Sequence, residues 1–366
     1  MPAPLIFWFR RDLRLSDNPG LTAAVETGLP IIPVFILDPE TEALGAAPKW
    51  RLGEALRVFG EALAAVGSRL ILRRGAADDV LKGLMAETGA EAVHWSRLYD
   101  PQARARDTAV KSAFKADGIE AVSHAGHVLW EPWTVETGSG GFYKVYTPFW
   151  KAVRGRDLPE PLGPPKLTAP EAWPVSDALD GWTLGGGMRR GGAVVAKYAQ
   201  VGSAAAEARL ETFVTERIAG YGEERDRLDV DATSRLSQNL TLGEISPRVC
   251  WFAGVRAMHE GKAGAEIFLK EIVWRDFAYH LLFHTPHIVD RNWRDDWDAF
   301  AWRGESDAAE RWRQGRTGEP VIDAAMREMY VTGTMHNRAR MLVASYLTKH
   351  LLTDWRIGLK WFEECL

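Results

Sequence analysis

Two clusters in the last third of the sequence carry side chains that can recognise a heterocyclic base. Glu271, Trp274 and Arg275 fall at helical spacing, and so do Asn337 and Met341. Because residues three and four apart share a helix face, we expect Glu271, Trp274 and Arg275 to point the same way, and Asn337 to lie beside Met341. A carboxylate and an amide can read the edge of a base, an indole can stack on its face, and a guanidinium can bind its phosphate.

A third segment, residues 233–237, places three hydroxyls and one guanidinium ahead of a predicted helix. Such a group suits a phosphate or a pyrophosphate. Each of the three segments also has a purely structural interpretation. The Ser and Thr residues can cap a helix, Trp274 can belong to a core, and Glu271 with Arg275 can be an ordinary surface pair. Taken together, the three segments favour a binding site.

Length and charge set limits on the fold and on its partners. With 366 residues, the chain is long enough for about two domains with substantial apolar cores. Its net charge of −4 gives no overall electrostatic preference for nucleic acid. A nucleic-acid surface must therefore be a local patch, and the Arg-rich stretch 291–340 is the candidate.

The cysteines and the N-terminus indicate a cytoplasmic protein. Cys250 and Cys365 lie far apart in the sequence, so neither a disulfide framework nor a zinc site is expected, which fits a reducing cytoplasm. The first apolar run is interrupted at once by Arg10 and Arg11, which is typical neither of a signal peptide nor of a membrane span.

Three closely spaced histidines, His280, His284 and His287, resemble a metal-binding pattern. A His-x-x-x-His pair on one helix face can bind zinc. However, Pro286 interrupts the helix and no further ligand motif accompanies the pair. We therefore interpret these histidines as structural and expect no metal.

The first part of the chain alternates short apolar runs with helix-length segments such as 50–66. This alternation is typical of parallel strands with crossover helices, and it predicts a doubly wound α/β domain over residues 1–130. Residues 10–14, RRDLR, follow the first run, so the G-x-G-x-x-G fingerprint of nicotinamide dinucleotide binding is absent there. The five predicted strands cover 5–9, 31–37, 70–72, 92–95 and 120–122.

The rest of the chain divides at the end of a segment rich in proline and glycine. Residues 131–195 contain PEPLGPP and GGGMRRGG, which indicate an inter-domain linker and not a phosphate-binding loop, because no strand precedes the glycines. From residue 196 to 366, apolar residues recur at helical spacing. The sequence therefore predicts an all-α C-terminal domain.

Several motifs resemble those of the DNA photolyase/cryptochrome family, in the same order from Pro4 to Leu366. The opening FWFRRDLRLSDN resembles the start of that family, and FYKVYTPFW its junction segment. The other matching segments are 233–237, which resembles the flavin phosphate loop, and 271–277, 318–326 and 335–341, which resemble the catalytic helices. Six colinear motifs across two unlike domains are far more specific than any one of them.

The resemblance implies a photolyase that repairs cyclobutane pyrimidine dimers in DNA with blue light. It implies an α/β domain for an antenna pigment and a helical domain for reduced FAD, which passes an electron to the dimer. The cofactor carries the difficult chemistry, and the protein supplies position and electrostatics. Photolyases act on a nucleotide that is flipped out of the duplex. The implied protein is a monomer that acts on damaged DNA.

Individual residues take roles from the family only where they match its motifs. Glu271 matches the carboxylate that hydrogen-bonds the dimer, Trp274 the indole that stacks on it, Asn337 an amide that contacts base and flavin, and Met341 a wall of the pocket. The residues implied for DNA contact are Trp274, Arg275, Arg338 and Arg340. Those implied for FAD are Tyr221, Thr233, Ser234, Arg235, Leu236, Ser237, Glu271, Arg275 and Asn337.

Two tryptophans match members of the family's electron-transfer chain. Trp312 matches the outer member and Trp355 the middle one, and together such residues photoreduce oxidised flavin. With sixteen tryptophans in the chain, core packing is the alternative for each. The resemblance ends at Leu366, before the family's Asp-x-Asp element and its Asn-x-Gly-Gly-Trp segment. We therefore expect a photolyase that lacks the C-terminal end of the FAD-binding domain, including the innermost tryptophan.

The antenna pigment is expected at the carboxyl edge of the predicted sheet, where residues 94–101 follow a strand and where open sheets bind ligands. In this family that region holds a folate or a deazaflavin. The Asn-Glu pair of one folate mode is replaced here by Pro101-Gln102. Of the two pigments we favour methenyltetrahydrofolate.

Two other functions remain open at the level of the sequence. A cryptochrome photoreceptor shares the fold and FAD but signals through a partner, and an inactive remnant would bind flavin or DNA without repair. Glu271, Trp274 and Asn337 favour repair. No histidine other than His336 stands beside Asn337, so we favour the cyclobutane dimer over the (6-4) photoproduct as the lesion.

Overall fold

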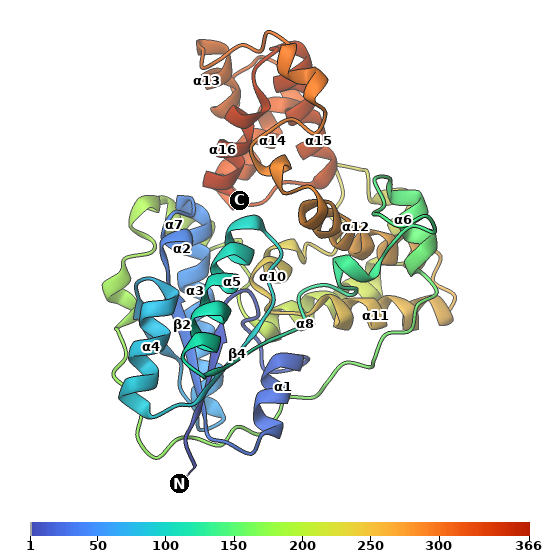
Figure 1. Ribbon diagram of the computed structural model, residues 1–366. Coiled ribbons are helices and arrows are strands. Elements are labelled where there is room, and N and C mark those ends of the chain that lie inside the picture. Colours follow the sequence, from blue (N-terminus) through green and yellow to red (C-terminus); the bar gives the residue numbers. More distant parts are fainter. Residues whose placement is uncertain (1) are drawn as a thin grey trace.

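The computed structural model describes residues 2–366 and shows an α/β domain joined to a helical domain (Figure 1). Five parallel strands form one sheet in the order β3-β2-β1-β4-β5. Each predicted apolar run overlaps one strand, so the prediction of a parallel sheet is confirmed. The strands are β1 Leu5–Phe9, β2 Ile31–Leu37, β3 Ile71–Arg74, β4 Ala92–Ser96 and β5 Glu120–His124.

Helices cover both faces of this sheet. Phe7 and Phe9 of β1 pack with α1 and α3 on one face, whereas Ile6 and Trp8 pack with α4 and α5 on the other. Because successive side chains of a strand point to opposite faces, a strand covered on both sides is apolar at every position. The helices of this domain are α1 Pro19–Glu26, α2 Pro39–Glu42, α3 Ala46–Ala65, α4 Ala77–Thr88 and α5 Pro101–Ala116.

Capping residues determine where the helices that follow strands β1 and β4 begin. Asn18 caps α1 by accepting a hydrogen bond from the backbone N–H of Leu21, and Asp100 caps α5 by accepting one from Ala103. A proline follows each cap at the first helical position, where its missing N–H leaves no helical bond unmade. These caps fix where the chain turns at the carboxyl edge of the sheet.

Residues 131–195, expected as a linker, contain a helix that packs on the helical domain. In α6 (Tyr146–Val153), Phe149 and Trp150 join a core with Val273 and Phe277 of α12 (Ala265–His284). The same segment holds α7 (Gly191–Val195) and short 3-10 turns at Pro132–Thr134, Leu179–Trp182 and Gly186–Met188.

The C-terminal half is helical, as the sequence predicts. Two of its turns are π-helical, at Phe213–Arg217 and Tyr346–His350, and two are 3-10 turns, at Pro286–Val289 and Asp295–Ala299. The remaining helices are α8 Ser203–Thr212, α9 Tyr221–Glu224, α10 Ser237–Leu242, α11 Pro247–His259, α13 Asp307–Arg313, α14 Pro320–Thr332, α15 Asn337–Ser345 and α16 Trp355–Cys365. Helices α13 to α16 share one core around Trp312, Met326 and Met329.

The helical domain contacts the α/β domain at several points. Helix α16 lies against the start of α3 so closely that a Cβ atom on Gly45 would overlap the backbone of Glu363. Arg14 donates a hydrogen bond to the carbonyl of Gly243 (3.0 Å), and Arg248 forms a buried ion pair with Asp17. These contacts fix the helical domain relative to the sheet.

Among residues 2–366, no helix is long and apolar enough to cross a membrane. Within the same range, no group of three or more His, Cys, Asp or Glu side chains is arranged to hold a metal ion. Two of the three histidines make structural contacts: His280 accepts a hydrogen bond from the backbone N–H of Tyr143, and His284 stacks on Phe142.

Candidate functional site

Helix α12 carries Glu271 on a face that also meets α9. Its buried side chains, among them Phe268, Ile272 and Val273, anchor the helix in two cores. The Glu271 carboxylate forms an ion pair with Arg225, which follows α9, at an Nη1–Oε1 distance of 2.5 Å. About a quarter of the Glu271 side chain is exposed (26 %), so the carboxylate remains open to an approaching ligand.

Trp274 lies one turn farther along α12 and presents an aromatic surface. Its indole stacks on the ring of Tyr146, with ring centroids 3.7 Å apart and planes 9° from parallel. Phe277 contacts both rings edge-on. Although Trp274 is stacked in this way, 45 % of it is exposed. An exposed indole beside a carboxylate provides a surface on which a base can stack and an acceptor or donor for its edge.

Arg275 departs from the prediction that it shares this face. Its guanidinium donates a hydrogen bond of 2.6 Å to the carbonyl of His127 and lies over the ring of Tyr279. Helical spacing places position 275 close to position 271 around the helix, but the hydrogen bond to His127 directs the guanidinium toward the α/β domain. The expectation that the side chains of Arg275 and Glu271 point the same way is therefore wrong for the guanidinium of Arg275. Its guanidinium is occupied within the protein, which argues against the expected contacts with phosphate and FAD.

An ion-pair chain joins the second cluster to the first. Arg338, near the start of α15, pairs with Asp226, which also lies beside Arg225. Because Arg225 pairs with Glu271, the two clusters predicted from the sequence lie at one site. Arg225 and Asp226 are residues that the sequence analysis missed. The sequence does contain an indication of Arg225. It follows Tyr221 by four residues, a spacing that places both side chains on one face of a helix.

The other residues of the second cluster differ in exposure. Asn337 begins α15 and is exposed, and Met341 is 54 % exposed, so both are open to a ligand. Arg340 instead donates a hydrogen bond of 3.0 Å to the carbonyl of Met335, and burial lowers the pKa of its guanidinium. Arg340 therefore serves the local structure, in contrast to its expected contact with DNA.

The predicted phosphate loop forms a turn ahead of α10. The backbone of Arg235 has a left-handed φ of 50°, which residues other than glycine rarely adopt. Its side chain pairs with Asp231. Arg209 holds this turn by donating a hydrogen bond of 2.6 Å to the carbonyl of Arg235. Of the neighbouring residues, Leu236 is buried, while Thr233, Ser234 and Ser237 keep their hydroxyls half-buried or exposed.

Tyr221 belongs to the same core as Leu236 of this turn. It is buried, packs edge-on against Phe213 and Phe268, and has the guanidinium of Arg225 over its ring. Burial, together with the negative charge of Glu271, raises the pKa of its hydroxyl to about 12. Tyr221 therefore stays neutral and links the loop region to the site around Glu271.

The two predicted electron-transfer tryptophans lie in different environments. Trp312 is completely buried, and its indole N–H donates a hydrogen bond of 3.0 Å to the carbonyl of Val343. An outer member of an electron-transfer chain must reach solvent, so this burial contradicts the role expected for Trp312. Trp355 is half-buried and donates a hydrogen bond of 2.8 Å to Asn292.

Trp302 is the better candidate for the outer position. Arg303 bridges to Thr353, and Asp354 donates a backbone hydrogen bond to the carbonyl of Arg303. These bonds bring the segment that carries Trp302 alongside Trp355, and Trp302 is only half-buried. Its sequence signal was indistinct, because several tryptophans lie within a few positions of it.

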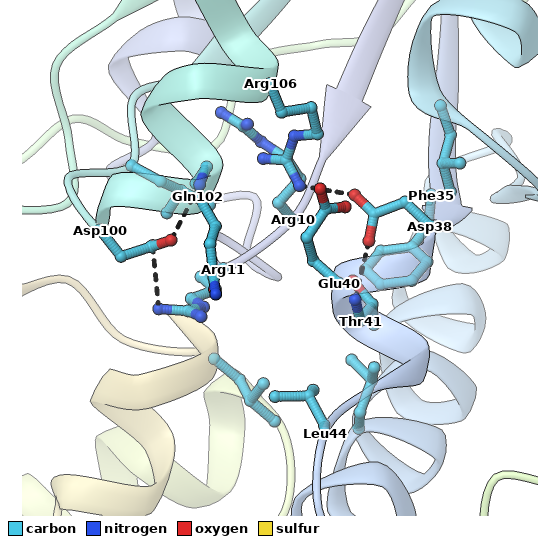
Figure 2. Close-up of a pocket in the computed structure, with 15 residues that line it drawn as sticks. Arg10, Arg11, Phe35, Asp38, Glu40, Thr41, Leu44, Asp100, Gln102 and Arg106 are labelled. Atoms are coloured by element: carbon cyan, nitrogen blue, oxygen red, sulfur yellow. Dashed lines mark hydrogen bonds and ion pairs between the residues drawn. The ribbon is translucent and has the colours of Figure 1, made fainter. Parts of the chain in front are cut away.

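A cavity of about 120 Å³ lies at the carboxyl edge of the sheet, where the antenna pigment is expected (Figure 2). It is lined by residues that follow β1, β2 and β4, among them Arg10, Arg11, Asp38, Asp100 and Gln102. Figure 2 shows the guanidinium of Arg106 beside Asp38 and that of Arg11 beside Asp100. The cavity thus combines charged groups with an apolar wall that includes Phe35 and Leu52.

Comparisons with known proteins agree with this architecture. Residues 5–169 match the family model of DNA photolyase, and residues 268–366 match that of the FAD binding domain of DNA photolyase. The deoxyribodipyrimidine photo-lyase of Agrobacterium fabrum is 46 % identical over 368 residues, covering 100 % of this chain and 77 % of that protein. Cryptochrome-2 of Arabidopsis thaliana is 32 % identical, with 63 % of its length covered.

Solved structures give the same result. A bacterial class III photolyase from Agrobacterium tumefaciens superposes with a TM-score of 0.97 at 45 % identity, covering 100 % of this chain and 77 % of that one. An archaeal photolyase from Sulfolobus tokodaii, solved with two FAD molecules, gives 0.84 at 28 % identity, covering 99 % and 79 %. This chain belongs to the DNA photolyase/cryptochrome family.

Proposed function

We propose that this protein repairs cyclobutane pyrimidine dimers in DNA in a reaction driven by blue light. The observation that carries the proposal is the placement of a solvent-accessible carboxylate, Glu271, one turn from an exposed indole, Trp274. A flipped-out dimer is flat on one side and carries carbonyl and N–H groups along its edge. Trp274 stacks on the flat side, and Glu271 hydrogen-bonds the edge.

Cations around this pair hold the backbone of the damaged strand. Arg338 is partly exposed and pairs with the exposed carboxylate of Asp226, so a DNA phosphate can replace that partner. Lys144 is exposed two residues before Tyr146, with its ammonium over the ring of Phe142. These contacts orient the strand without reading its sequence, whereas Trp274 and Glu271 recognise the lesion.

The residues present fit FAD. The turn at Arg235 offers a guanidinium and the hydroxyls of Thr233, Ser234 and Ser237, which are suitable donors for a pyrophosphate. A non-glycine residue in the left-handed region persists only where its surroundings enforce it, and such residues cluster at ligand-binding sites. When bound, reduced FAD supplies the electron that splits the dimer under blue light. Asn337 and Tyr221 would border the cofactor.

The cavity of Figure 2 would receive part of the antenna pigment, for which we propose methenyltetrahydrofolate. Arg11, which is partly exposed and lies 3.6 Å from Asp100, provides a cation for the pigment's carboxylates, and Phe35 and Leu52 provide apolar contact. Mass spectrometry of the pigments extracted from the purified protein tests this assignment. A deazaflavin or a second flavin in place of the folate would overturn it.

The protein acts on damaged DNA as a monomer in the cytoplasm in this proposal. Both cysteines are buried and free, which fits a reducing compartment. Light scattering of the purified protein tests the oligomeric state, because a monomer has a mass of 40.8 kDa. A dimer at micromolar concentration would contradict this part of the proposal.

The decisive experiment measures repair directly. Protein loaded with FAD and kept under reducing conditions is mixed with an oligonucleotide that contains one thymine dimer, and the restored thymines are quantified in blue light and in the dark. We expect repair in light only, and its loss in Trp274→Leu. A protein that binds FAD but does not repair the dimer would be a photoreceptor or an inactive remnant, and repair of a (6-4) photoproduct alone would change the assigned lesion.

A further inference from the structure

Tyr146 is an aromatic residue beside the lesion-recognition site that the sequence analysis gave no role. It is the first residue of α6, and its ring lies face to face with Trp274 at a centroid separation of 3.7 Å. Its hydroxyl donates a hydrogen bond of 2.6 Å to the carbonyl of Lys270. In a regular helix that carbonyl also accepts the N–H of residue 274. Tyr146 therefore contacts Trp274 through its ring and the preceding helical turn through its hydroxyl.

The rest of α6 holds Tyr146 in this place. Phe149 packs against Phe277 and His280 of α12, at centroid distances of 5.2 and 4.9 Å. Just before the helix, the backbone N–H of Tyr143 donates a hydrogen bond of 3.1 Å to His280. Burial and the negative charge of Glu271 also raise the pKa of the Tyr146 hydroxyl, so this group remains a hydrogen-bond donor at neutral pH. Contacts made by Tyr143 before Tyr146 and by Phe149 after it therefore hold the tyrosine in place.

An exposed tryptophan on a helix would otherwise sample several rotamers, each with its indole plane in a different direction. Ordering such a side chain on binding opposes affinity. A parallel aromatic neighbour restricts that freedom before the ligand arrives, and it covers part of one indole face. With Tyr146 on one face and 45 % of Trp274 exposed, the opposite face is the surface left for stacking.

We propose that Tyr146 is a positioning residue for lesion recognition: it covers one face of Trp274, fixes the indole plane, and presents the other face to the flipped-out dimer. This inference rests on the proposed function, because it concerns the same site. It assigns to α6 a part in substrate specificity. An alternative arrangement, in which the dimer displaces Tyr146 and stacks on the face that the tyrosine covers, makes the opposite prediction for binding.

The first test is a binding cycle with four proteins: wild type, Tyr146→Leu, Trp274→Leu and the double variant. Affinities are measured for a thymine-dimer oligonucleotide and for the undamaged sequence. We expect Tyr146→Leu to weaken binding of the dimer about three- to tenfold, the range for one aromatic pair, and to leave undamaged DNA unchanged. In the Trp274→Leu background the same change should have no further effect. Tyr146→Phe, which keeps the ring, should stay within about twofold of wild type.

Phe142→Leu is the matched control. It removes an aromatic ring from the same segment, but that ring stacks on His284, away from Trp274. It should leave the preference for the dimer unchanged. Three results would each overturn the inference. The first is that Tyr146→Leu binds the dimer as tightly as wild type or more tightly, and the second is that it loses equal affinity for undamaged DNA. The third is that it weakens dimer binding by the same factor in the Trp274→Leu background. A wild-type protein without any preference for the dimer would instead overturn the proposed function itself.

A second measurement observes residue 274 directly in the wild-type protein. In protein labelled with 5-fluorotryptophan, the fluorine resonance of residue 274, assigned through Trp274→Phe, should carry the ring-current shift of the stacked Tyr146. That shift should persist when the dimer oligonucleotide is added, because the lesion takes the opposite face. If the ring-current shift of Tyr146 disappears on binding, the tyrosine is displaced by the lesion and the inference is wrong.

Discussion

Arg225 and Glu271 form an ion pair with an Nη1–Oε1 distance of 2.5 Å, and the same arginine lies beside Asp226, the partner of Arg338. The carboxylate proposed to hydrogen-bond the lesion is therefore linked through ion pairs to an arginine proposed to bind DNA phosphate. The four side chains of this ion-pair network are partly exposed. Replacing one partner with a phosphate or a base therefore has a small cost in free energy.

Glu271→Ala should reduce the rate of light-driven repair about 100-fold, the usual effect of removing one hydrogen-bonding group that stabilises developing charge. Its effect on the free energy of unfolding should stay below about 1 kcal/mol, since both partners of the ion pair are partly exposed. Repair kinetics and urea denaturation measure the two quantities. Glu266→Ala is the matched control, because Glu266 lies on the same helix in an exposed pair with Lys270. An equal loss of repair in both variants would contradict the assigned role.

Trp312→Phe and Trp302→Phe should change different properties: the first the stability of the fold, and the second the photoreduction of FAD. The first removes a completely buried indole and its hydrogen bond to Val343, so it should lower the free energy of unfolding by about 1–3 kcal/mol. The second should leave stability nearly unchanged and slow the photoreduction of bound, oxidised FAD. Urea denaturation and the light-induced loss of flavin absorbance separate these effects. Slow photoreduction in a stable Trp312→Phe variant would restore the role first expected for Trp312.

Arg235 offers a test of the cofactor loop that separates charge from backbone strain. Arg235→Gly removes the guanidinium and relieves the strain of a φ of 50°, whereas Arg235→Ala removes the guanidinium and keeps that strain of about 1 kcal/mol. Both should weaken FAD binding about tenfold or more, the usual loss for a hydrogen bond to a charged group, and the glycine variant should be the more stable of the two. Titration with FAD and thermal unfolding supply the measurements. Asp231→Asn, which frees Arg235 from its ion pair, should not weaken FAD binding.

Stability should fall in acid because of His127, which lies at the contact between the domains. Burial and the nearby Arg275 lower the pKa of His127 well below its usual 6.5. A base whose pKa is lower in the folded state contributes stability above pH 6.5, and that stability is lost as the pH falls toward the folded pKa. The slope cannot exceed about 1.4 kcal/mol per pH unit for one group.

His127→Gln should flatten this dependence between pH 6.5 and 5. Urea denaturation at several pH values measures it in both proteins. The variant will keep a residual slope, because burial also lowers the pKa of His124 and of His280 to about 4. If wild type and variant have parallel slopes, His127 is not the group that titrates.

The sequence predicted the sheet well because parallel strands covered on both faces are apolar throughout, as β1 and β2 are. It predicted the neighbourhood of Glu271 and Trp274 because helical spacing is regular. It missed the direction of Arg275, since a charge pattern cannot distinguish a phosphate ligand from an inter-domain hydrogen bond. The burial of Trp312 was equally hidden, because an indole is common both in cores and in electron-transfer chains.

Tyr146 shows the other limit of sequence reasoning. Its distance from Trp274 along the chain is large, and nothing in the segment FYKVYTPFW indicates which of its aromatic rings lies against α12. Only the packing of α6 on that helix brings the two rings together. The same holds for Arg51 and Glu244, whose ion pair joins α3 to the loop that follows α10.

The close approach of Gly45 and Glu363 also bears on how the chain folds. During synthesis the α/β domain is complete long before α16 is made. The start of α3 therefore lacks its contact with α16 until hundreds of further residues have been added. Contacts of such long sequence separation form late, after the entropy of closing a large loop has been lost. We therefore expect refolding in which the sheet domain gains its structure first, and in which the docking of α16 on Gly45 is the slow closing event.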